Sequence, residues 1–408
     1  MADTLRPRDT KDVEAAVQWA LAQRKSLEIV GHGTKRALGR PAQVDATLDL
    51  AGLTGITLYE PEELVLSARA GTPLAEIEAL IEQKGQALAF EPMDFGPLLG
   101  TPVGQATIGG VLAANLSGPR RIKAGAARDH FLGFTAVSGR GETFKSGGRV
   151  VKNVTGYDLC KLIAGSWGTL AAMTDVTIKT LPRPETEATV LVLGLDTERA
   201  IAAMTAAMGS SGEVAGAAHF SAAVAARASD DLATGRSVTA LRLEGVAPSV
   251  AHRKGTLEAL MQPYGMLASL DAAQSRALWA AIRDVVPFAA HGAAGERIVW
   301  RLSTAPAAGA SLTRRIAQAA DAEFIHDWAG GLVWAALAPS EDGGAIAVRA
   351  AIAACGGHAT LVRAPAALRA AVGAFAPEPD GLAALTRRVK EGFDPQGVLG
   401  PGRMWAGV

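Results

Sequence analysis

The chain has 408 residues, enough for two or three domains that each bury a core of their own. Lysine plus arginine and aspartate plus glutamate number 40 each, so no net charge favours nucleic acid or an anionic membrane surface. The two cysteines, Cys160 and Cys355, are too few for a disulfide framework and lack zinc-binding spacing, so we expect a protein of the reducing cytoplasm.

Neither export nor a membrane span is predicted. Residues 1–10 carry acids, two arginines and a proline where a signal peptide needs an apolar core. Residues 95–119 are uncharged and long enough to cross a membrane. Their prolines and glycines, together with Gln105 and Asn115, predict buried loops instead.

Hydrophobic spacing and capping residues predict the elements of the first part of the chain. An amphipathic helix over 11–25 precedes a short strand over 27–30, which runs directly into a glycine turn. A strand over 64–70 precedes a helix that Thr72 is expected to cap, with Pro73 at its first position.

Strand patterns continue to a boundary near residue 185. Residues 131–137 and 142–145 predict a hairpin, and the β-branched stretch 173–180 predicts a strand. Two closely spaced prolines then mark the end of the first domain.

Beyond this point, strand-like stretches alternate with alanine-rich helical ones, which indicates an α+β domain with an antiparallel sheet. The predicted strands are 189–195, 237–243, 297–303 and 331–337. A helix over 382–390 and a turn-rich arm end the chain.

Three glycine-centred turns occur in order at 31–35, 107–110 and 165–169. Backbone without side chains lets several N–H groups point at one anion or one flat ring. The second turn begins a short apolar helix whose N-terminus can face a phosphate. The spacing fits neither the GxGxxG motif nor a Walker loop. Taken alone, each turn is more simply explained as an ordinary turn than as a binding site. The three together indicate a large phosphate-bearing cofactor.

The motifs that carry a family resemblance are residues 31–35, 59–72, 107–118, 152–159, 165–169 and 401–403. Their order resembles that of the vanillyl-alcohol oxidase, or PCMH-type, superfamily of FAD-binding flavoproteins. Within it, the chain is most similar to the FAD-binding E subunits of bacterial glycolate oxidases, over essentially its whole length.

The resemblance implies an α+β fold in three parts. These are a two-subdomain PCMH-type FAD-binding domain over 1–185, a cap domain with an antiparallel sheet over 186–380, and a C-terminal arm over 381–408 that packs on the FAD domain. FAD is expected to bind non-covalently, because attachment in relatives uses a histidine at another place in the glycine loop than His32.

The resemblance also implies the cofactor-binding residues. The first turn would bind the pyrophosphate, the second would line the same groove, the third would contact the flavin, and two strand residues would lie near the adenine. The expected residues are Gly31, His32, Gly33, Thr34, Lys35, Thr107, Ile108, Gly109, Gly110, Asn115, Gly168, Thr169, Met173 and Val176.

Several features of the sequence depart from the family pattern, and the role of two arginines stays open. Ala171 stands where relatives commonly have glycine, and Gly400 where they have asparagine. The metal-binding histidines of relatives that oxidise 2-hydroxy acids have no clustered counterpart, so no metal is expected. The cap histidines are His219, His252, His291, His326 and His358. Arg301 and Arg363 are candidates to meet a carboxylate or a partner, and equally could be exposed strand charges.

The implied function is that of an FAD-carrying subunit of a complex that oxidises glycolate to glyoxylate, with hydride transfer to flavin N5. Electrons would pass to an iron–sulfur subunit, since this chain lacks a cysteine cluster of its own. A second FAD-binding glycolate oxidase subunit is the other implied partner, and a small 2-hydroxy acid is the substrate of the complex. Contact with the inner face of the membrane would be peripheral, through the complex.

Two alternatives remain open, and no catalytic residue is assigned. The chain is either a stand-alone FAD-dependent 2-hydroxy-acid dehydrogenase with a cap histidine as base, or a non-catalytic flavin-bearing scaffold or relay. A third class, a binding protein for another phosphorylated ligand, would stay colourless after FAD is supplied.

Overall fold

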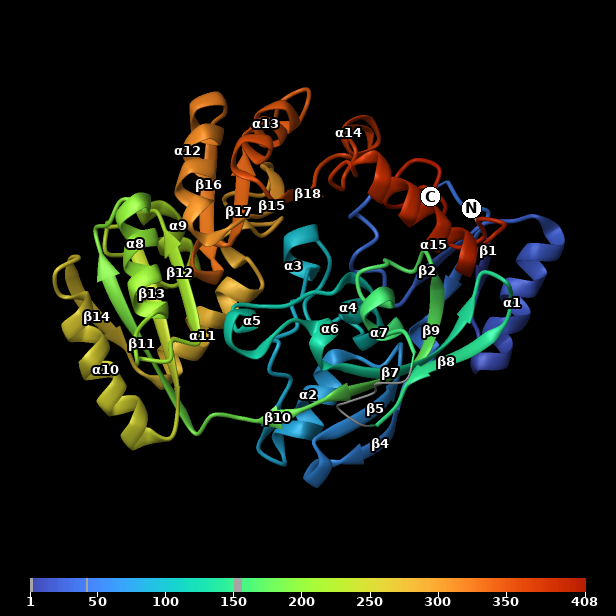
Figure 1. The fold of residues 1–408 in the computed structure, drawn as a ribbon, viewed down its shortest axis with the longest axis horizontal. Helices are drawn as coiled ribbons and strands as arrows, with labels where there is room; N and C mark the ends of the chain where they lie inside the picture. Colours follow the sequence, from blue (N-terminus) through green and yellow to red (C-terminus); the bar gives the residue numbers. More distant parts are fainter. Residues whose placement is uncertain (1–2, 42, 150–155) are drawn as a thin grey trace.

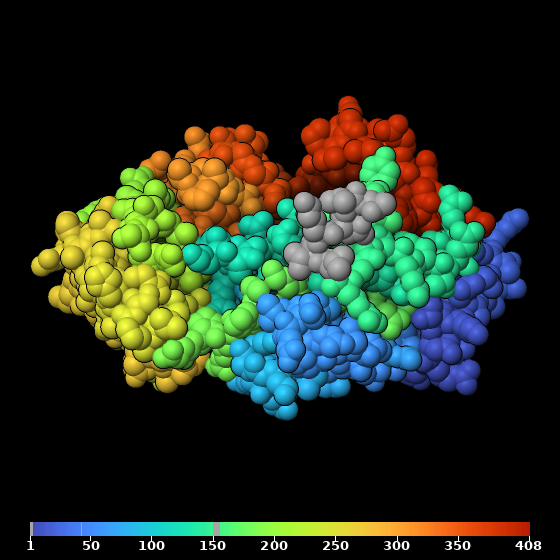
Figure 2. Space-filling view, turned by 60° about the horizontal axis from the view of Figure 1, so that its bottom comes forward, coloured from blue at the N-terminus to red at the C-terminus, as the bar shows by residue number. Residues whose placement is uncertain are grey.

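The computed structural model describes residues 3–41, 43–149 and 156–408, which form two halves that lie side by side (Figure 1). The first half holds a three-stranded and a five-stranded sheet, and the second holds an eight-stranded sheet. In the space-filling view, residues coloured cyan join the blue half to the yellow and orange half (Figure 2).

The first sheet is parallel, in the order β1(Asp3–Leu5), β3(Ala46–Asp49), β2(Leu27–Val30). Helix α1(Thr10–Gln23) begins where the Asp9 carboxylate accepts a hydrogen bond from the N–H of Asp12. Its apolar stripe, which includes Val13 and Val17, is fully buried against this sheet. The predicted helix over 11–25 and strand over 27–30 are therefore confirmed.

The second sheet is antiparallel and carries the predicted hairpin. Its order is β4(Ile56–Glu60), β5(Val65–Arg69), β9(Ala171–Lys179), β7(Phe131–Ser138), β8(Thr143–Gly147). A two-stranded sheet pairs β10(Leu181–Pro182) with β6(Gln86–Ala87).

Short helices fill the space between the five-stranded sheet and the second half of the molecule (Figure 1). They are α2(Leu74–Glu82), α3(Gly96–Leu99), α4(Ile108–Ala114), α5(Arg121–Ala124), α6(Ala127–His130) and α7(Leu159–Ile163). Short 3₁₀ turns follow several elements throughout the chain: η1(Leu50–Gly52), η2(Pro61–Glu63), η3(Asp230–Leu232), η4(Val286–Phe288), η5(Pro306–Ala308) and η6(Trp328–Gly330).

The start predicted for α2 is wrong by one residue. Pro73 is the N-cap rather than the first helical residue, since its ψ of 136° is not helical. The N–H of Leu74 donates to the carbonyl of Ala106. The Thr72 hydroxyl does not cap the helix and instead donates to the carbonyl of Arg69 at 2.7 Å.

The eight-stranded sheet of the second half is antiparallel throughout, as predicted. Its order is β14(Met266–Leu270), β11(Thr186–Leu193), β13(Val238–Gly245), β12(Gly216–Phe220), β16(Ala322–Asp327), β17(Leu332–Leu337), β15(Ile298–Ser303), β18(His358–Arg363).

The two faces of this sheet have different partners. One face packs on α8(Thr197–Met208), α10(Ala247–Met261), α12(Gly309–Ala319) and α13(Ala345–Cys355). The other face shares a single core with the first half, to which α9(Ala222–Ala228) and α11(Ala272–Arg283) also contribute. Side chains of both halves meet there, and Phe95 packs edge-on against Trp334 at 6.0 Å between ring centroids.

The C-terminal segment returns to the first half after α14(Ala366–Val372) and α15(Asp380–Phe393). Leu399 forms a parallel bridge with Leu27, and Arg403 donates to the carbonyl of Lys35. The division at residues 185 and 380 stays a prediction. In the ranges that the structure describes, no helix is long and apolar enough to cross a membrane.

A buried ion pair holds this segment in place, and its removal should destabilise the fold. The Lys390 ammonium donates to Asp394 and to the carbonyls of Thr169 and Leu399, each at 2.7 Å. We expect Lys390→Met to lower the free energy of unfolding by about 3–5 kcal/mol, because Asp394 is left buried and uncompensated. Urea denaturation followed by circular dichroism measures the change. Lys161→Met, which removes a half-exposed ion pair, is the control and should cost at most about 1 kcal/mol; equal losses would contradict this role.

Candidate cofactor-binding site

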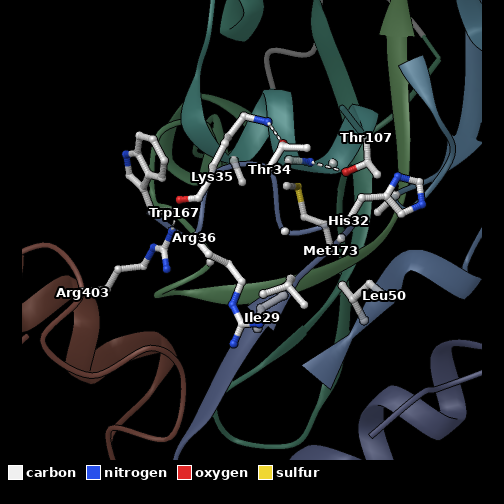
Figure 3. A pocket seen from close by; sticks show the side chains of 18 of the residues that line it. Ile29, His32, Thr34, Lys35, Arg36, Leu50, Thr107, Trp167, Met173 and Arg403 are labelled. Carbon is white, nitrogen blue, oxygen red and sulfur yellow. Dashed lines mark hydrogen bonds between the residues drawn. The ribbon is translucent and has the colours of Figure 1, made fainter. Parts of the chain in front are cut away.

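A pocket lies where the end of β2, the start of α4 and the turn before β9 meet (Figure 3). It contains about 710 Å³ that protein atoms do not fill, part of it open to solvent. The lining residues are Ile29, Val30, Gly31, His32, Gly33, Thr34, Lys35, Arg36, Leu50, Ala70, Thr107, Gly109, Gly110, Ala113, Trp167, Gly168, Ala171, Met173 and Arg403.

Close backbone approach brings the first two glycine turns together. A Cβ on Gly31 would lie 2.7 Å from the hydroxyl oxygen of Thr107, and one on Gly109 would lie 2.7 Å from the carbonyl oxygen of Ala70. Gly33 has a φ of +73°, which residues with side chains rarely adopt. Glycine at these positions therefore lets strand, helix and turn close around one space.

The first turn presents a row of free donors. Among the described residues, the backbone N–H groups of Gly31, His32, Gly33, Thr34 and Lys35 have no hydrogen-bond partner. Consecutive unbonded N–H groups in a concave turn form an anion-binding nest. This part of the pocket is therefore suited to phosphate oxygens.

The N–H groups at the start of α4 are bonded within the protein. The N–H of Ile108 donates to the carbonyl of Thr72, and that of Gly109 to the carbonyl of Ala70. The N–H of Gly110 donates to the Thr107 hydroxyl at 3.3 Å. Thr107, Gly109 and Gly110 line the pocket, and that the start of this helix faces a phosphate stays a prediction.

Lys35 brings a positive charge to the pocket. Its buried ammonium lies 3.4 Å from the Thr34 hydroxyl and has no acidic partner among the described residues. Burial lowers the pKa of Lys35 to about 8, and the charge of Asp94 acts in the opposite direction. The neighbouring arginines, unlike Lys35, have an acidic partner. Arg36 and Arg403 both pair with Glu28, at 2.6 and 3.5 Å.

Most of the predicted cofactor residues line this pocket and four do not. Ile108 is fully buried in the core, and Val176 is 1% exposed on β9. Asn115 ends α4 in the left-handed conformation, where its side-chain oxygen accepts from the N–H of Arg128. The Thr169 hydroxyl donates to the carbonyl of Ser166. Contacts of these four residues with a cofactor stay a prediction.

Other lining residues were not predicted. Leu50 lies on η1 and carries no motif. Arg403 belongs to the C-terminal Pro-Gly-Arg motif, which was a signal for it. Trp167, interpreted from sequence as a packing aromatic, both lines the pocket and packs against Phe375. Of the predicted motif at 152–159, residues 152–155 lie outside the described residues, and Tyr157 is 93% exposed.

The cap histidines are not all isolated, as their sequence positions suggested. His219 and His326 face each other across β12 and β16 with ring centroids 5.9 Å apart. Burial lowers their pKa values to about 4 and about 3, so both are neutral. Within the described ranges, no three metal-ligating side chains lie close enough to hold an ion.

The two candidate arginines of the cap have different environments. Arg363 is a structural group, since its guanidinium donates to the carbonyls of Leu98, Phe288, Ala294 and Arg297. Arg301 forms no hydrogen bond with any described residue, and its Nε is buried.

Comparison with known proteins agrees with this geometry. Residues 2–147 match the FAD binding domain family. Over 391 residues the chain is 32% identical to glycolate oxidase subunit GlcE of Escherichia coli (strain K12), covering 96% of this chain and 95% of that protein. Over 188 residues it is 30% identical to glycolate oxidase subunit GlcD of Bacillus subtilis (strain 168), covering 46% of this chain and 38% of that protein.

The fold is shared with more distant enzymes. The structure of 4-ethylphenol oxidase from Gulosibacter chungangensis in its isoeugenol complex matches 99% of this chain and 89% of that chain, with a TM-score of 0.72 at 13% identity. The fold and the pocket define a FAD-dependent oxidoreductase with a PCMH-type FAD-binding fold. Within this class, the chain belongs to the family of glycolate oxidase subunit GlcE.

The charge on Lys35 predicts how FAD affinity depends on pH. An anion beside the ammonium stabilises the protonated lysine, so the pKa in the complex rises above the value of about 8 in the free pocket. Affinity for FAD should therefore be highest below pH 8 and fall as the pH rises through this value.

Lys35→Met should remove this pH dependence and weaken FAD binding at pH 7 by about 10- to 100-fold. Quenching of flavin fluorescence during titration measures both effects. Lys84→Met, on the exposed surface, is the control. Wild-type affinity that stays constant between pH 7 and 10 would show that the ammonium does not contact the cofactor.

Proposed function

We propose that the chain is the FAD-carrying subunit of a glycolate oxidase or dehydrogenase complex that converts glycolate to glyoxylate. The observation that carries the proposal is a pocket lined by residues 31–35, whose five backbone N–H groups have no partner among the described residues and which include the buried cationic Lys35. Similarity to GlcE over nearly the whole chain supports the substrate.

The pocket residues fit the chemical parts of FAD. The nest at 31–35 and the Lys35 ammonium suit the pyrophosphate, while Ile29, Leu50 and Met173 offer apolar surface to a ring. When bound, FAD supplies the redox chemistry by accepting the α-hydrogen of the substrate as hydride at N5. The protein binds and orients the cofactor and sets the charge around it.

Several contacts support non-covalent binding. The His32 Nδ1 lies 3.0 Å from the carbonyl oxygen of Gln105, and in Figure 3 its ring points away from the middle of the pocket. Of the residues that the structure describes, those that line the pocket include no cysteine or tyrosine. Burial also raises the pKa of the Cys160 thiol to about 12, which leaves it unreactive.

Electrons from a reduced flavin need a route through other polypeptides. The two cysteines of the chain cannot ligate an iron–sulfur cluster, which needs four. We propose an iron–sulfur subunit as acceptor and a second FAD-binding subunit, of the kind named GlcD in Bacillus subtilis, as the other partner. The complex would lie in the cytoplasm or peripherally on the inner face of the membrane.

Non-covalent binding predicts that the cofactor leaves on denaturation. The purified chain supplied with FAD should be yellow, and acid precipitation should release all of the flavin into the supernatant, identified as FAD by chromatography. A colourless preparation would overturn the assignment as a flavoprotein. Colour that remains in the pellet would show covalent attachment.

Addition of glycolate without oxygen distinguishes catalysis from electron relay. We expect the FAD-loaded chain to keep its colour when alone and to bleach after the second FAD subunit is added, because the cap holds no histidine cluster for metal-assisted oxidation in the described ranges. Bleaching of the isolated chain would instead establish a stand-alone dehydrogenase. An absorbance spectrum recorded before and after each addition is the measurement.

A further inference from the structure

Arg301 lies on the face of the eight-stranded sheet that meets the first half of the molecule. It stands opposite Trp334 on β17 and Thr360 on β18, so these three side chains share one face. Trp334 contacts Phe95 of the first half, which identifies the direction of that face. The Arg301 side chain therefore points toward the boundary between the two halves.

Several arginines at this boundary are paired, whereas Arg301 is not. Arg242 donates twice to the Glu91 carboxylate, at 2.7 and 2.9 Å, and Arg120 pairs with Glu244 at 2.6 Å. Arg363 is saturated by backbone carbonyls. Arg301 has no acidic or carbonyl partner among the described residues, although its Nε is buried. A buried guanidinium without partners is costly to the fold.

Two guanidinium groups lie beside the ring of Trp328, those of Arg301 and Arg121. The Arg301 guanidinium lies 5.2 Å from the ring centroid of Trp328, and the guanidinium of Arg121 lies 4.4 Å from it. Trp328 is fixed by its indole N–H, which donates to the carbonyl of Gly118 at 3.0 Å. In Figure 1, α5, which carries Arg121, lies between the large sheet and the other helices of the first half.

The nearby titratable groups do not neutralise these charges. Asp327 is the acid whose charge acts on Arg301, and Asp129 is the acid whose charge acts on Arg121. Burial raises the pKa of Asp327 to about 7, so it is only partly ionised at neutral pH. One of its oxygens accepts from the N–H of Trp328. Burial, and then the charges of Arg301 and Arg121, lower the pKa of His358. Both arginines are partly exposed, and neither forms an ion pair with an acid among the described residues.

We propose that Arg301 and Arg121, which both lie beside the ring of Trp328, form a binding site for the carboxylate of a small 2-hydroxy or 2-oxo acid. Guanidinium groups bind carboxylates through paired, charge-assisted hydrogen bonds. The assignment to this class of acid rests on the proposed function, whereas the anion site rests on the unpaired arginines. The proposed site also lies near the cofactor pocket. Gly118, whose carbonyl accepts the hydrogen bond from the Trp328 indole, comes five residues after the pocket residue Ala113. The Cα atoms of Gly118 and Ala113 are therefore at most about 19 Å apart.

The test is calorimetric titration of the FAD-loaded chain at pH 7 with glycolate, and with glycolamide as a neutral analogue of the same size. We expect glycolate to bind and glycolamide not to. Arg301→Gln and Arg121→Gln should each weaken glycolate binding at least about tenfold. Arg276→Gln, which removes an exposed arginine of the cap, is the matched control and should leave the affinity unchanged.

A stability measurement separates binding from a structural role. Because Arg301 has no hydrogen-bond partner among the described residues, Arg301→Gln should melt no lower than the wild-type chain, whereas an arginine needed for folding would lower the melting temperature. If Arg301→Gln does not fold, Arg301→Lys and Arg121→Gln decide the question, and both should weaken binding.

The proposal is overturned if the FAD-loaded chain binds no glycolate, or if neither arginine substitution changes the affinity. Equal binding of glycolamide would also overturn it, since the site would not recognise charge. Failure of the proposed function looks different, because the chain would then retain no FAD. Titration of the FAD-free chain with glycolate would in that case still test the anion site.

Discussion

The site depends on the close approach of three chain segments at glycines, where a side chain would not fit. Gly31 lies against Thr107, and Gly109 lies against the carbonyl of Ala70, in spaces where a Cβ would be 2.7 Å from its neighbour. Here the N–H groups at the start of α4 are bonded within the protein, whereas those of residues 31–35 have no hydrogen-bond partner among the described residues. The concave row of donors is therefore a product of packing, and the buried Lys35 ammonium adds charge to the same space.

The boundary between the two halves combines a shared apolar core with a few buried charges. Paired groups such as Arg242 and Glu91 connect the large sheet to the first half, and their geometry satisfies the donors of each guanidinium. Arg301 occupies the same face without a partner. Proteins keep such uncompensated groups mainly where a ligand completes them, which distinguishes this position from the structural arginines around it.

Prediction from sequence succeeded where the signal is local. Helix α1, strand β2 and the hairpin of β7 and β8 follow hydrophobic periodicity and turn residues, and the structure confirms them. Strand β12, with the sequence Gly-Ala-Ala-His-Phe, was not predicted, because all of its residues are buried and no alternation marks it. The start of α2 was misplaced by one residue, since Pro73 has a non-helical ψ of 136° and is the N-cap.

The sequence by itself determined the family, the antiparallel cap and most of the residues around the pocket, because glycine turns and motif order record local backbone needs. Only the tertiary structure decided which donors stay free and which charges stay unpaired. Arg363 and Arg301 look alike in the sequence, yet a carbonyl 265 positions away, that of Leu98, bonds one of them and nothing described bonds the other. Which polar groups find a hydrogen-bond partner depends on distant segments that meet on folding. No local sequence pattern therefore predicts it.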